Sequence, residues 1–199
     1  MNRSAGELHA LVLAAGAARR FGAVKQLAQI DGEPLLRRVI RCAAPAAERT
    51  WVILGAHARE IEPLLTRSPV TTYFNMLWHE GISSSIRAGI ELLPHSCTAV
   101  MLVLADQPLI RTLDYTRLAQ AWRAAPTTIV AAGYGTHAGA PAIFPRRFFS
   151  ELQQLKGDVG AKSLLQQHAA ALHTVPMPRA SFDVDTPADL AAAPDSTID

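Results

Sequence analysis

The sequence predicts an α/β domain built on a doubly wound, mostly parallel sheet. The chain has 199 residues, which suits a single domain of ordinary size. Short apolar runs of strand length alternate with segments whose apolar residues recur at helical spacing. The run at residues 99–105 (AVMLVLA) is apolar throughout, as expected of a strand that is covered on both faces. We therefore expect this run to be the central strand.

The first half of the chain alternates regularly between predicted strands and helices. Residues 8–14 form an apolar run that ends before a glycine and indicates a buried strand. Residues 34–44 (PLLRRVIRCAA) form a helix with proline in its first turn. Three further strands are expected at residues 51–54, 70–74 and 99–105. Two further helices are expected at residues 58–65 and 83–93.

The second half is less regular and contains neither a repeat nor a linker. A helix is expected at residues 113–124, a strand at 128–132 and an extended segment at 140–144. Three further helices are expected at residues 148–155, 161–170 and 187–192. Two short strands are expected at residues 173–175 and 182–184, and residues 194–199 form a polar tail. Ligands of such a sheet bind beyond the carboxyl ends of its strands, so we expect function in the loops that follow strands.

Composition excludes several classes of protein. With 49% hydrophobic and 18% charged residues, the chain is too apolar for intrinsic disorder, and its apolar runs are far shorter than the roughly 20 residues of a membrane-spanning helix. A net charge of +2 without a basic block argues against nucleic acid as a partner. The first residues lack the cleavage site of a signal peptide, which favours a cytoplasmic location. Cys42 and Cys97 lack metal-ligand spacing and are expected to be buried thiols.

The loop after the first predicted strand carries a concentration of cations. It reads LAAGAARRFGAVKQL over residues 13–27 and contains Arg19, Arg20 and Lys25. Backbone N–H groups and cations beyond a strand can bind phosphates, which favours an anionic ligand. The glycine spacing matches neither a dinucleotide fingerprint nor a P-loop. A surface turn that happens to carry arginines is the alternative, and the residues alone leave both open.

Carboxylates follow two other predicted strands. Asp106, in LADQPL, comes directly after the central strand, where it could hold Mg²⁺ against phosphates or instead act as an ordinary turn residue. Asp183 and Asp185, in SFDVDTPADL, are expected on one face of a short strand. We expect one of these two to be a metal ligand and the other to be structural, with Asp185 or Thr186 capping the last helix.

A serine-rich segment begins another predicted helix. Gly81 is followed by Ser83, Ser84 and Ser85, whose hydroxyl and N–H groups face the expected ligand side. Simple helix capping is the alternative for each serine. Asn75 and Trp78 precede this segment and are expected to shape its loop.

Taken together, LAAGxxxRFGxxKQL, ADQP, GISSSIRAG, GDVGAKSLL and FDVDTPADL are a specific combination. Over residues 8 to about 193 the chain resembles the small nucleotidyltransferases of molybdenum cofactor metabolism, most closely the cytidylyltransferases. The resemblance implies a Rossmann-like nucleotidyltransferase fold and an Mg²⁺-dependent enzyme that transfers CMP from CTP to the phosphate of a molybdopterin-type acceptor, with release of pyrophosphate. It further implies a nucleotide-binding half at about 8–110, an acceptor-binding half at about 111–193, and a client molybdoenzyme as a protein partner.

The resemblance also assigns roles to residues. Arg20, Lys25 and Asp106 would be catalytic, with the two cations on the triphosphate, and Asp106 and Asp183 would bind the metal. Asp183 is favoured over Asp185 by its spacing from the motif proline. The remaining nucleotide contacts would be Leu13, Ala14, Ala15, Gly16, Gly81, Ser83 and Ser84. The acceptor contacts would be Gly139, Pro141, Asp158, Gly160 and Lys162.

Departures from the family pattern bear on specificity. Ala15 gives the LAAG form that the resemblance associates with cytidylyl transfer, whereas guanylyl relatives usually have a second glycine there. Ala18 stands where Ser or Gly is common, and Ala140 stands where His is common. Two other functions stay open: nucleotidyl transfer to a sugar phosphate or another phosphorylated small molecule, and non-catalytic carriage of the molybdenum cofactor.

Overall fold

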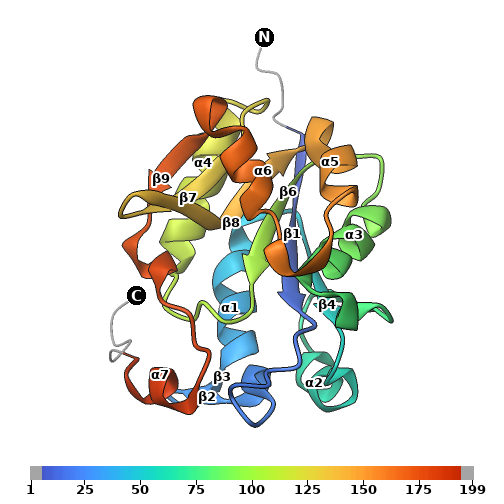
Figure 1. Cartoon of the computed structure of the whole chain (residues 1–199), viewed down its shortest axis with the longest axis vertical. Helices are drawn as coiled ribbons and strands as arrows, with labels where there is room; N and C mark the ends of the chain where they lie inside the picture. The colour runs from blue at the N-terminus through green and yellow to red at the C-terminus, as the bar shows by residue number, and fades with distance from the viewer. Residues whose placement is uncertain (1–5, 194–199) are drawn as a thin grey trace.

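A seven-stranded sheet in the order β5-β4-β1-β6-β8-β7-β9 forms the centre of the α/β fold (Figure 1). The structure is a computed structural model that describes residues 6–193. The strands are β1 (Glu7–Ala14), β4 (Arg49–Leu54), β5 (Thr71–Phe74), β6 (Cys97–Leu104), β7 (Val130–Tyr134), β8 (His137–Pro145) and β9 (His173–Pro176). All neighbouring pairs are parallel except those of β8, which runs antiparallel to both β6 and β7. The predicted fold class is confirmed, and β6 is the middle strand as expected.

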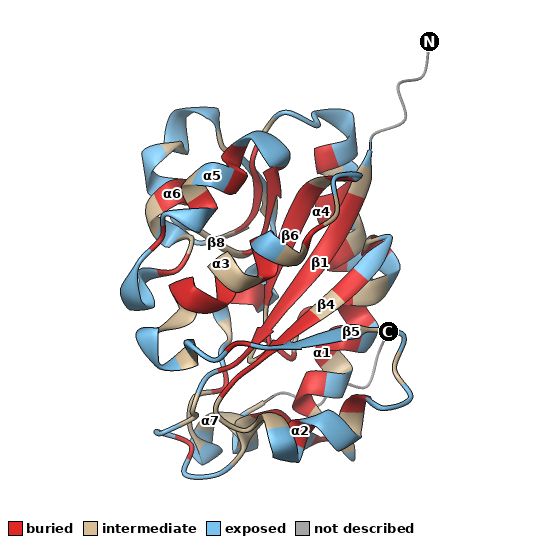
Figure 2. Ribbon diagram, turned by 90° about the vertical axis from the view of Figure 1, so that its right-hand side faces the viewer, coloured by how far each residue is buried: buried red, intermediate tan, exposed pale blue. Residues whose placement is uncertain are grey.

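Two helical layers bury the sheet on both faces. α1 (Leu35–Ala43), α2 (Ala58–Leu65) and α4 (Thr112–Ala124) pack on one face, while α3 (Ile82–Leu92), α5 (Phe149–Gln153) and α6 (Lys162–Gln167) pack on the other. Alternate residues of β1 therefore enter different clusters: Val12 joins the first, and Leu11 and Leu13 join the second. Figure 2 shows the resulting continuous burial along β1. α7 (Pro187–Ala191) follows the last strand.

Small differences from the predicted elements have local causes. The helix expected at residues 161–170 ends at Gln167, and Ala169–Ala171 form a separate 3-10 turn. The loop after β1 contains a short hairpin of β2 (Gln29–Ile30) and β3 (Glu33–Pro34). Asp31 and Gly32 turn this hairpin with φ of +53° and +77°, a conformation that Asp-Gly pairs favour. The polar tail at 194–199 lies outside the described residues.

The strand expected at residues 182–184 is wrong. This segment follows a 3-10 turn at Pro178–Ser181 and pairs with no strand. β6 already has β1 and β8 as neighbours, so no free edge is available beside it. Instead, the buried Val184 donates one hydrogen bond from its backbone N to the Asp106 carbonyl, at 2.9 Å. That bond holds the segment across the carboxyl end of β6.

Two further expectations concern the cysteines and membranes. Cys42 and Cys97 are both buried, as expected, and burial raises the pKa of the Cys97 thiol to about 11. Within the described part of the chain, no helix is long and apolar enough to cross a membrane.

Candidate active site

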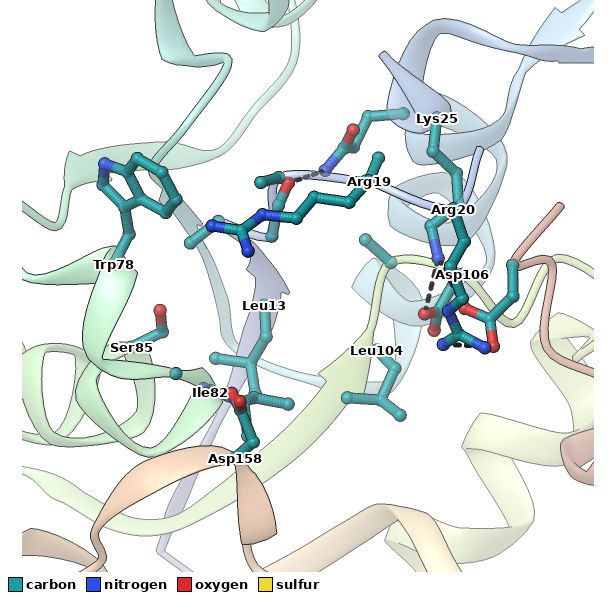
Figure 3. A pocket seen from close by; sticks show the side chains of 18 of the residues that line it. Leu13, Arg19, Arg20, Lys25, Trp78, Ile82, Ser85, Leu104, Asp106 and Asp158 are labelled. Atoms are coloured by element: carbon teal, nitrogen blue, oxygen red, sulfur yellow. Dashed lines mark hydrogen bonds and ion pairs between the residues drawn. The ribbon is translucent and has the colours of Figure 1, made fainter. Parts of the chain in front are cut away.

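A pocket of about 460 Å³ opens at the carboxyl ends of β1 and β6 (Figure 3). Its walls come from the loop after β1, the residues that follow β6, the start of α3, and two later segments around Asp158 and Asp185. The volume is typical of a small-molecule site, and the position is where doubly wound sheets bind ligands. The loops that the sequence singles out therefore meet at one site.

One end of the pocket is a network of opposite charges. Lys25 Nζ lies 3.0 Å from Asp106 Oδ2 and 3.3 Å from Asp185 Oδ1, and Arg20 Nη2 lies 2.9 Å from Asp185 Oδ2. The Lys25 side chain is only 13% exposed, whereas that of Arg20 is 73% exposed. Lys25 is thus held inside the site by two carboxylates that come from distant parts of the chain. This arrangement favours the ligand-binding interpretation of the loop over a surface turn.

The carboxylates of this end differ in their surroundings. Asp106 Oδ1 is buried and has no hydrogen-bond partner among the described residues. Asp183 does not line the pocket, but its pKa is raised, chiefly because the surrounding protein desolvates it and also because the Asp106 charge is near; a hydrogen bond from Gln107 opposes the shift. Asp185 does line the pocket and pairs with both cations. Asp106 and Asp183 thus share a negative region in which an added cation would be stabilised.

The loop after β1 is fixed by a residue that the sequence reasoning missed. Gln26 is 3% exposed, and its Nε2 donates to the carbonyls of Ala14 and Gly16 at 3.1 and 3.4 Å. Leu13, Ala15 and Gly16 line the pocket, as the nucleotide-binding assignment expects. Ala14 does not line the pocket, because its side chain packs in the core cluster beneath α1, α2 and α4. A glutamine directly after the motif lysine was the available signal.

Ala18 adopts the left-handed conformation, with φ of +48°. Its carbonyl accepts hydrogen bonds from the backbone N of Phe21 and of Gly22, at 3.0 and 3.2 Å, which closes the turn that carries Arg19 and Arg20. An alanine in this conformation costs roughly 1–2 kcal/mol relative to the right-handed region, and glycine avoids that cost. The turn geometry therefore explains the preference for glycine at this position that the resemblance implies.

The serine-rich segment is oriented by Asn75. Its Nδ2 donates to Ser84 Oγ at 2.9 Å and to Ser85 Oγ at 3.1 Å, so Asn75 shapes the loop as expected. Gly81 and Ser85 line the pocket, whereas Ser83 and Ser84 do not. Ser84 donates to the Gly81 carbonyl, at 2.8 Å, and Ser83 is fully buried. Of the three serines only Ser85 lines the pocket, whereas the nucleotide contacts expected from the sequence were Ser83 and Ser84.

The expected acceptor residues are dispersed around the pocket. Asp158 lines it and accepts a hydrogen bond from the Ile82 backbone N at 3.3 Å, and Gly160 packs against Ile82. Gly139 and Pro141 lie in the first half of β8, which runs beside the carboxyl end of β6, and Lys162 is exposed at the start of α6. Of these five residues only Asp158 reaches the pocket itself.

Comparison with known proteins agrees with this geometry. The sequence matches the model of the MobA-like NTP transferase domain over residues 10–172. The chain belongs to this family of nucleotidyltransferases. Two curated relatives, named probable molybdenum cofactor guanylyltransferase and found in Synechococcus elongatus and in another Synechococcus strain, are each 46% identical over 43 residues. That match spans 22% of this chain and 22% of each relative, so it bears on only part of either protein.

Solved structures of similar fold cover nearly the whole chain. Rv0371c of Mycobacterium tuberculosis H37Rv is 26% identical, with a TM-score of 0.83 over 95% of this chain and 98% of that one. A second structure of that protein, in complex with manganese, gives 23% identity and a TM-score of 0.78 over the same shares. The same fold therefore extends over nearly the whole chain.

Proposed function

We propose that this MobA-like nucleotidyltransferase transfers CMP from CTP to the phosphate of a molybdopterin-type acceptor and releases pyrophosphate. The observation that carries the proposal is the paired charge network at the pocket, in which Lys25 and Arg20 meet Asp106 and Asp185 beside the LAAG backbone. Family membership supports transfer of a nucleotidyl group to a phosphorylated acceptor. Nucleotide and acceptor identity are the parts that we propose.

When the nucleotide binds, Lys25 and Arg20 would leave their carboxylate partners and pair with the triphosphate instead. Both cations are held against carboxylates by ion pairs of 2.9 to 3.3 Å, so they are already oriented toward the site. A triphosphate offers them a stronger anion, and the fixed positive charge then stabilises the charge that develops during transfer. Preorganisation by Asp106 and Asp185 removes part of the cost of ordering these side chains.

Asp106 and Asp183 suit a divalent cation. Magnesium is commonly held by one or two carboxylates together with substrate phosphates, and no three His, Cys, Asp or Glu of residues 6–193 gather to form a complete protein cage. The unpartnered Asp106 Oδ1 is the oxygen that most needs such a partner. The manganese complex of Rv0371c supports a divalent ion at this fold. When bound, Mg²⁺ would supply positive charge to the phosphates.

The transfer step needs no covalent enzyme intermediate. An oxygen of the acceptor phosphate attacks the α-phosphorus of CTP, and a new P–O bond forms. The bond from the α-phosphorus to the oxygen that bridges it to the β-phosphate breaks, and pyrophosphate leaves with that electron pair. Lys25 and Arg20 orient the triphosphate for in-line displacement, and the buried position of Lys25 strengthens its interaction with the phosphate charge.

The choice of CTP rests on Ala15. It lines the pocket, and its methyl group lies close to Gly55 of the neighbouring loop, where a Cβ would stand 2.8 Å from it. The methyl group thus sets how closely the two loops pack, and one methyl in a shaped pocket is worth about 10- to 200-fold in discrimination. The short match to guanylyltransferases favours GTP instead, so the two nucleotides must be compared directly.

The test is kcat/KM for CTP and GTP with one acceptor, in wild type and in Ala15→Gly. We expect wild type to prefer CTP and the variant to gain GTP use. Equal use of both nucleotides by wild type would contradict the cytidylyl proposal. A CTP preference that Ala15→Gly leaves unchanged would keep the proposal and remove Ala15 as its cause.

The acceptor would approach from the β8 side. Gly139 leaves room for the hydroxyl of Tyr134, because a Cβ at residue 139 would collide with it. The pKa of this hydroxyl is raised, chiefly by burial and additionally by the nearby charge of Asp183. In this proposal β7 and β8 would extend the site beyond Asp106 and Asp183. We place Gly139, Pro141, Gly160 and Lys162 around the acceptor, with Asp158 at the boundary between the two substrates.

A further inference from the structure

The end of the pocket away from Asp106 has a different chemical character. Figure 3 shows Trp78 and Ser85 on one side and Lys25, Arg20 and Asp106 on the other, with Leu13 between them. The charged end fits phosphates, so the aromatic end is left for the rest of the nucleotide. Neither Trp78 nor Arg19 has a role in the charge network described above.

The backbone of Trp78 is held in place at this end. Its backbone N donates to the Asn75 carbonyl at 3.3 Å, and its own carbonyl accepts from the Gly81 N at 3.2 Å. Gly55 allows the close approach of Trp78 to the LAAG loop, because a Cβ at Gly55 would stand 2.6 Å from Trp78 Cβ and 2.5 Å from the Ala15 carbonyl oxygen. The backbone and Cβ of Trp78 therefore have a fixed position beside the backbone that is expected to meet the base, and the indole lines the pocket from there.

Arg19 is the cation of the loop that is left without a partner. Among residues 6–193 it makes no hydrogen bond or ion pair, in contrast to Arg20, which binds Asp185. Its guanidinium extends across the pocket toward Trp78 and away from the carboxylates (Figure 3). Two planar groups thus border the aromatic end, one from each side of the pocket.

We propose that Trp78 and Arg19 hold the base of the bound nucleotide, which stacks on the indole and is covered by the guanidinium plane. The proposal rests on the proposed nucleotidyltransferase function and assigns it two binding residues. Indole and guanidinium faces both stack on nucleobases, and stacking accepts any base. Stacking on Trp78 then supplies affinity for the base, and the choice between bases is left to the Ala15 loop, as proposed above.

The test measures equilibrium binding of CTP and of inorganic tripolyphosphate by calorimetry, each with MgCl₂. Trp78→Ala should weaken CTP binding by about 5- to 150-fold, the range for loss of one base-stacking contact, and leave tripolyphosphate binding unchanged. Trp78→Phe should stay near wild type, since it keeps an aromatic face. Arg19→Lys keeps the positive charge but removes the planar guanidinium group. It should therefore weaken CTP binding and leave tripolyphosphate binding unchanged. Met76→Ala, an exposed neighbour, is the matched control.

The alternatives give different results. Equal losses for CTP and tripolyphosphate in Trp78→Ala would mean that Trp78 only shapes the loop, which overturns the proposal. Unchanged CTP binding in that variant overturns it as well. Either result leaves the proposed function intact if wild type binds CTP. Failure of wild type to bind any nucleoside triphosphate would instead refute the proposed function, and this inference with it.

Discussion

Lys25 is the residue on which most of the charge network depends, because it contacts both Asp106 and Asp185. We predict that Lys25→Ala lowers turnover by roughly a hundredfold or more at saturating nucleotide, by analogy with loss of one transition-state donor. Lys156→Ala is the matched control, since that lysine is exposed and outside the pocket. Steady-state kinetics on both variants, with unfolding curves to confirm that they fold, provide the measurement. Near wild-type turnover in Lys25→Ala would contradict a catalytic role for Lys25.

Isosteric Asp→Asn substitutions distinguish the roles of the three carboxylates at the charged end of the pocket. Asp106→Asn and Asp183→Asn should each raise the Mg²⁺ concentration needed for half-maximal activity by at least about tenfold, because an amide lacks the charge that a hard cation requires. Asp185→Asn should do less, since both oxygens of Asp185 already pair with Arg20 or Lys25, whereas Asp106 Oδ1 has no partner among the described residues. Asp31→Asn, at an exposed turn, controls for lost charge. Equal effects at Asp183 and Asp185, or none at Asp106, would reverse the assignment of metal ligands.

His9 links stability to pH at a point far from the site. It is fully buried, accepts a hydrogen bond on Nδ1 from Trp51 Nε1 at 3.1 Å, and contacts Glu7 through Nε2. Burial lowers its pKa despite the opposing effect of Glu7, so the folded protein binds the proton more weakly than the unfolded chain. The stability that neutral His9 contributes is therefore complete above about pH 6.5, the unfolded value, and is lost as pH falls toward the folded pKa.

Urea unfolding at pH 7.5 and pH 5.5 checks this prediction. The loss of unfolding free energy between the two pH values should be smaller in His9→Gln than in wild type. His173→Gln, at an exposed position, should behave like wild type. An identical pH dependence in all three proteins would show that His9 does not contribute.

At the scale of elements, the start of α3 depends on contact with a distant turn. Gly81 has φ of +96° and ψ of 177°, a region that only glycine adopts readily, and a Cβ there would meet Asp158 and Gly157. Gly81→Ala should therefore destabilise the protein by about 2 kcal/mol or more, through backbone strain and displacement of Asp158. Gly135→Ala also has positive φ but faces open space, so it should cost only about 1 kcal/mol. Thermal unfolding that gives equal losses would remove the Asp158 contact from the explanation.

Elements with strong local patterns were predictable. Continuous apolar composition marked β6 as central because both of its faces are covered, and helical spacing marked α1 and α4. The direction of β8 was not predictable, because an apolar run has the same composition in either orientation. The alternation in residues 182–184 indicated a strand, but pairing needs a free edge, which is a property of the whole sheet.

At the scale of the whole molecule, the site joins segments that sequence spacing cannot relate. The first-strand loop and Asp106 were predictable, since both follow parallel neighbouring strands. Asp158 accepts a hydrogen bond from Ile82 of α3, which lies 76 positions earlier in the sequence. Asp185 pairs with Lys25, which lies 160 positions earlier. Ser85 was passed over for Ser83 and Ser84 because helix phase, not composition, decides which serine faces the pocket. Such contacts follow from the folded path of the chain.

Pyrophosphate release tests the central claim most directly. Purified protein would be given MgCl₂, a molybdopterin-type acceptor with a free phosphate, and CTP, GTP or ATP in parallel, with each nucleotide also tested without acceptor. The proposed function predicts acceptor-dependent pyrophosphate release that is fastest with CTP and abolished when EDTA removes the metal. If none of the three nucleotides gives pyrophosphate, the result would contradict catalysis and favour a non-catalytic cofactor carrier. Faster release with GTP than with CTP would contradict the cytidylyl assignment.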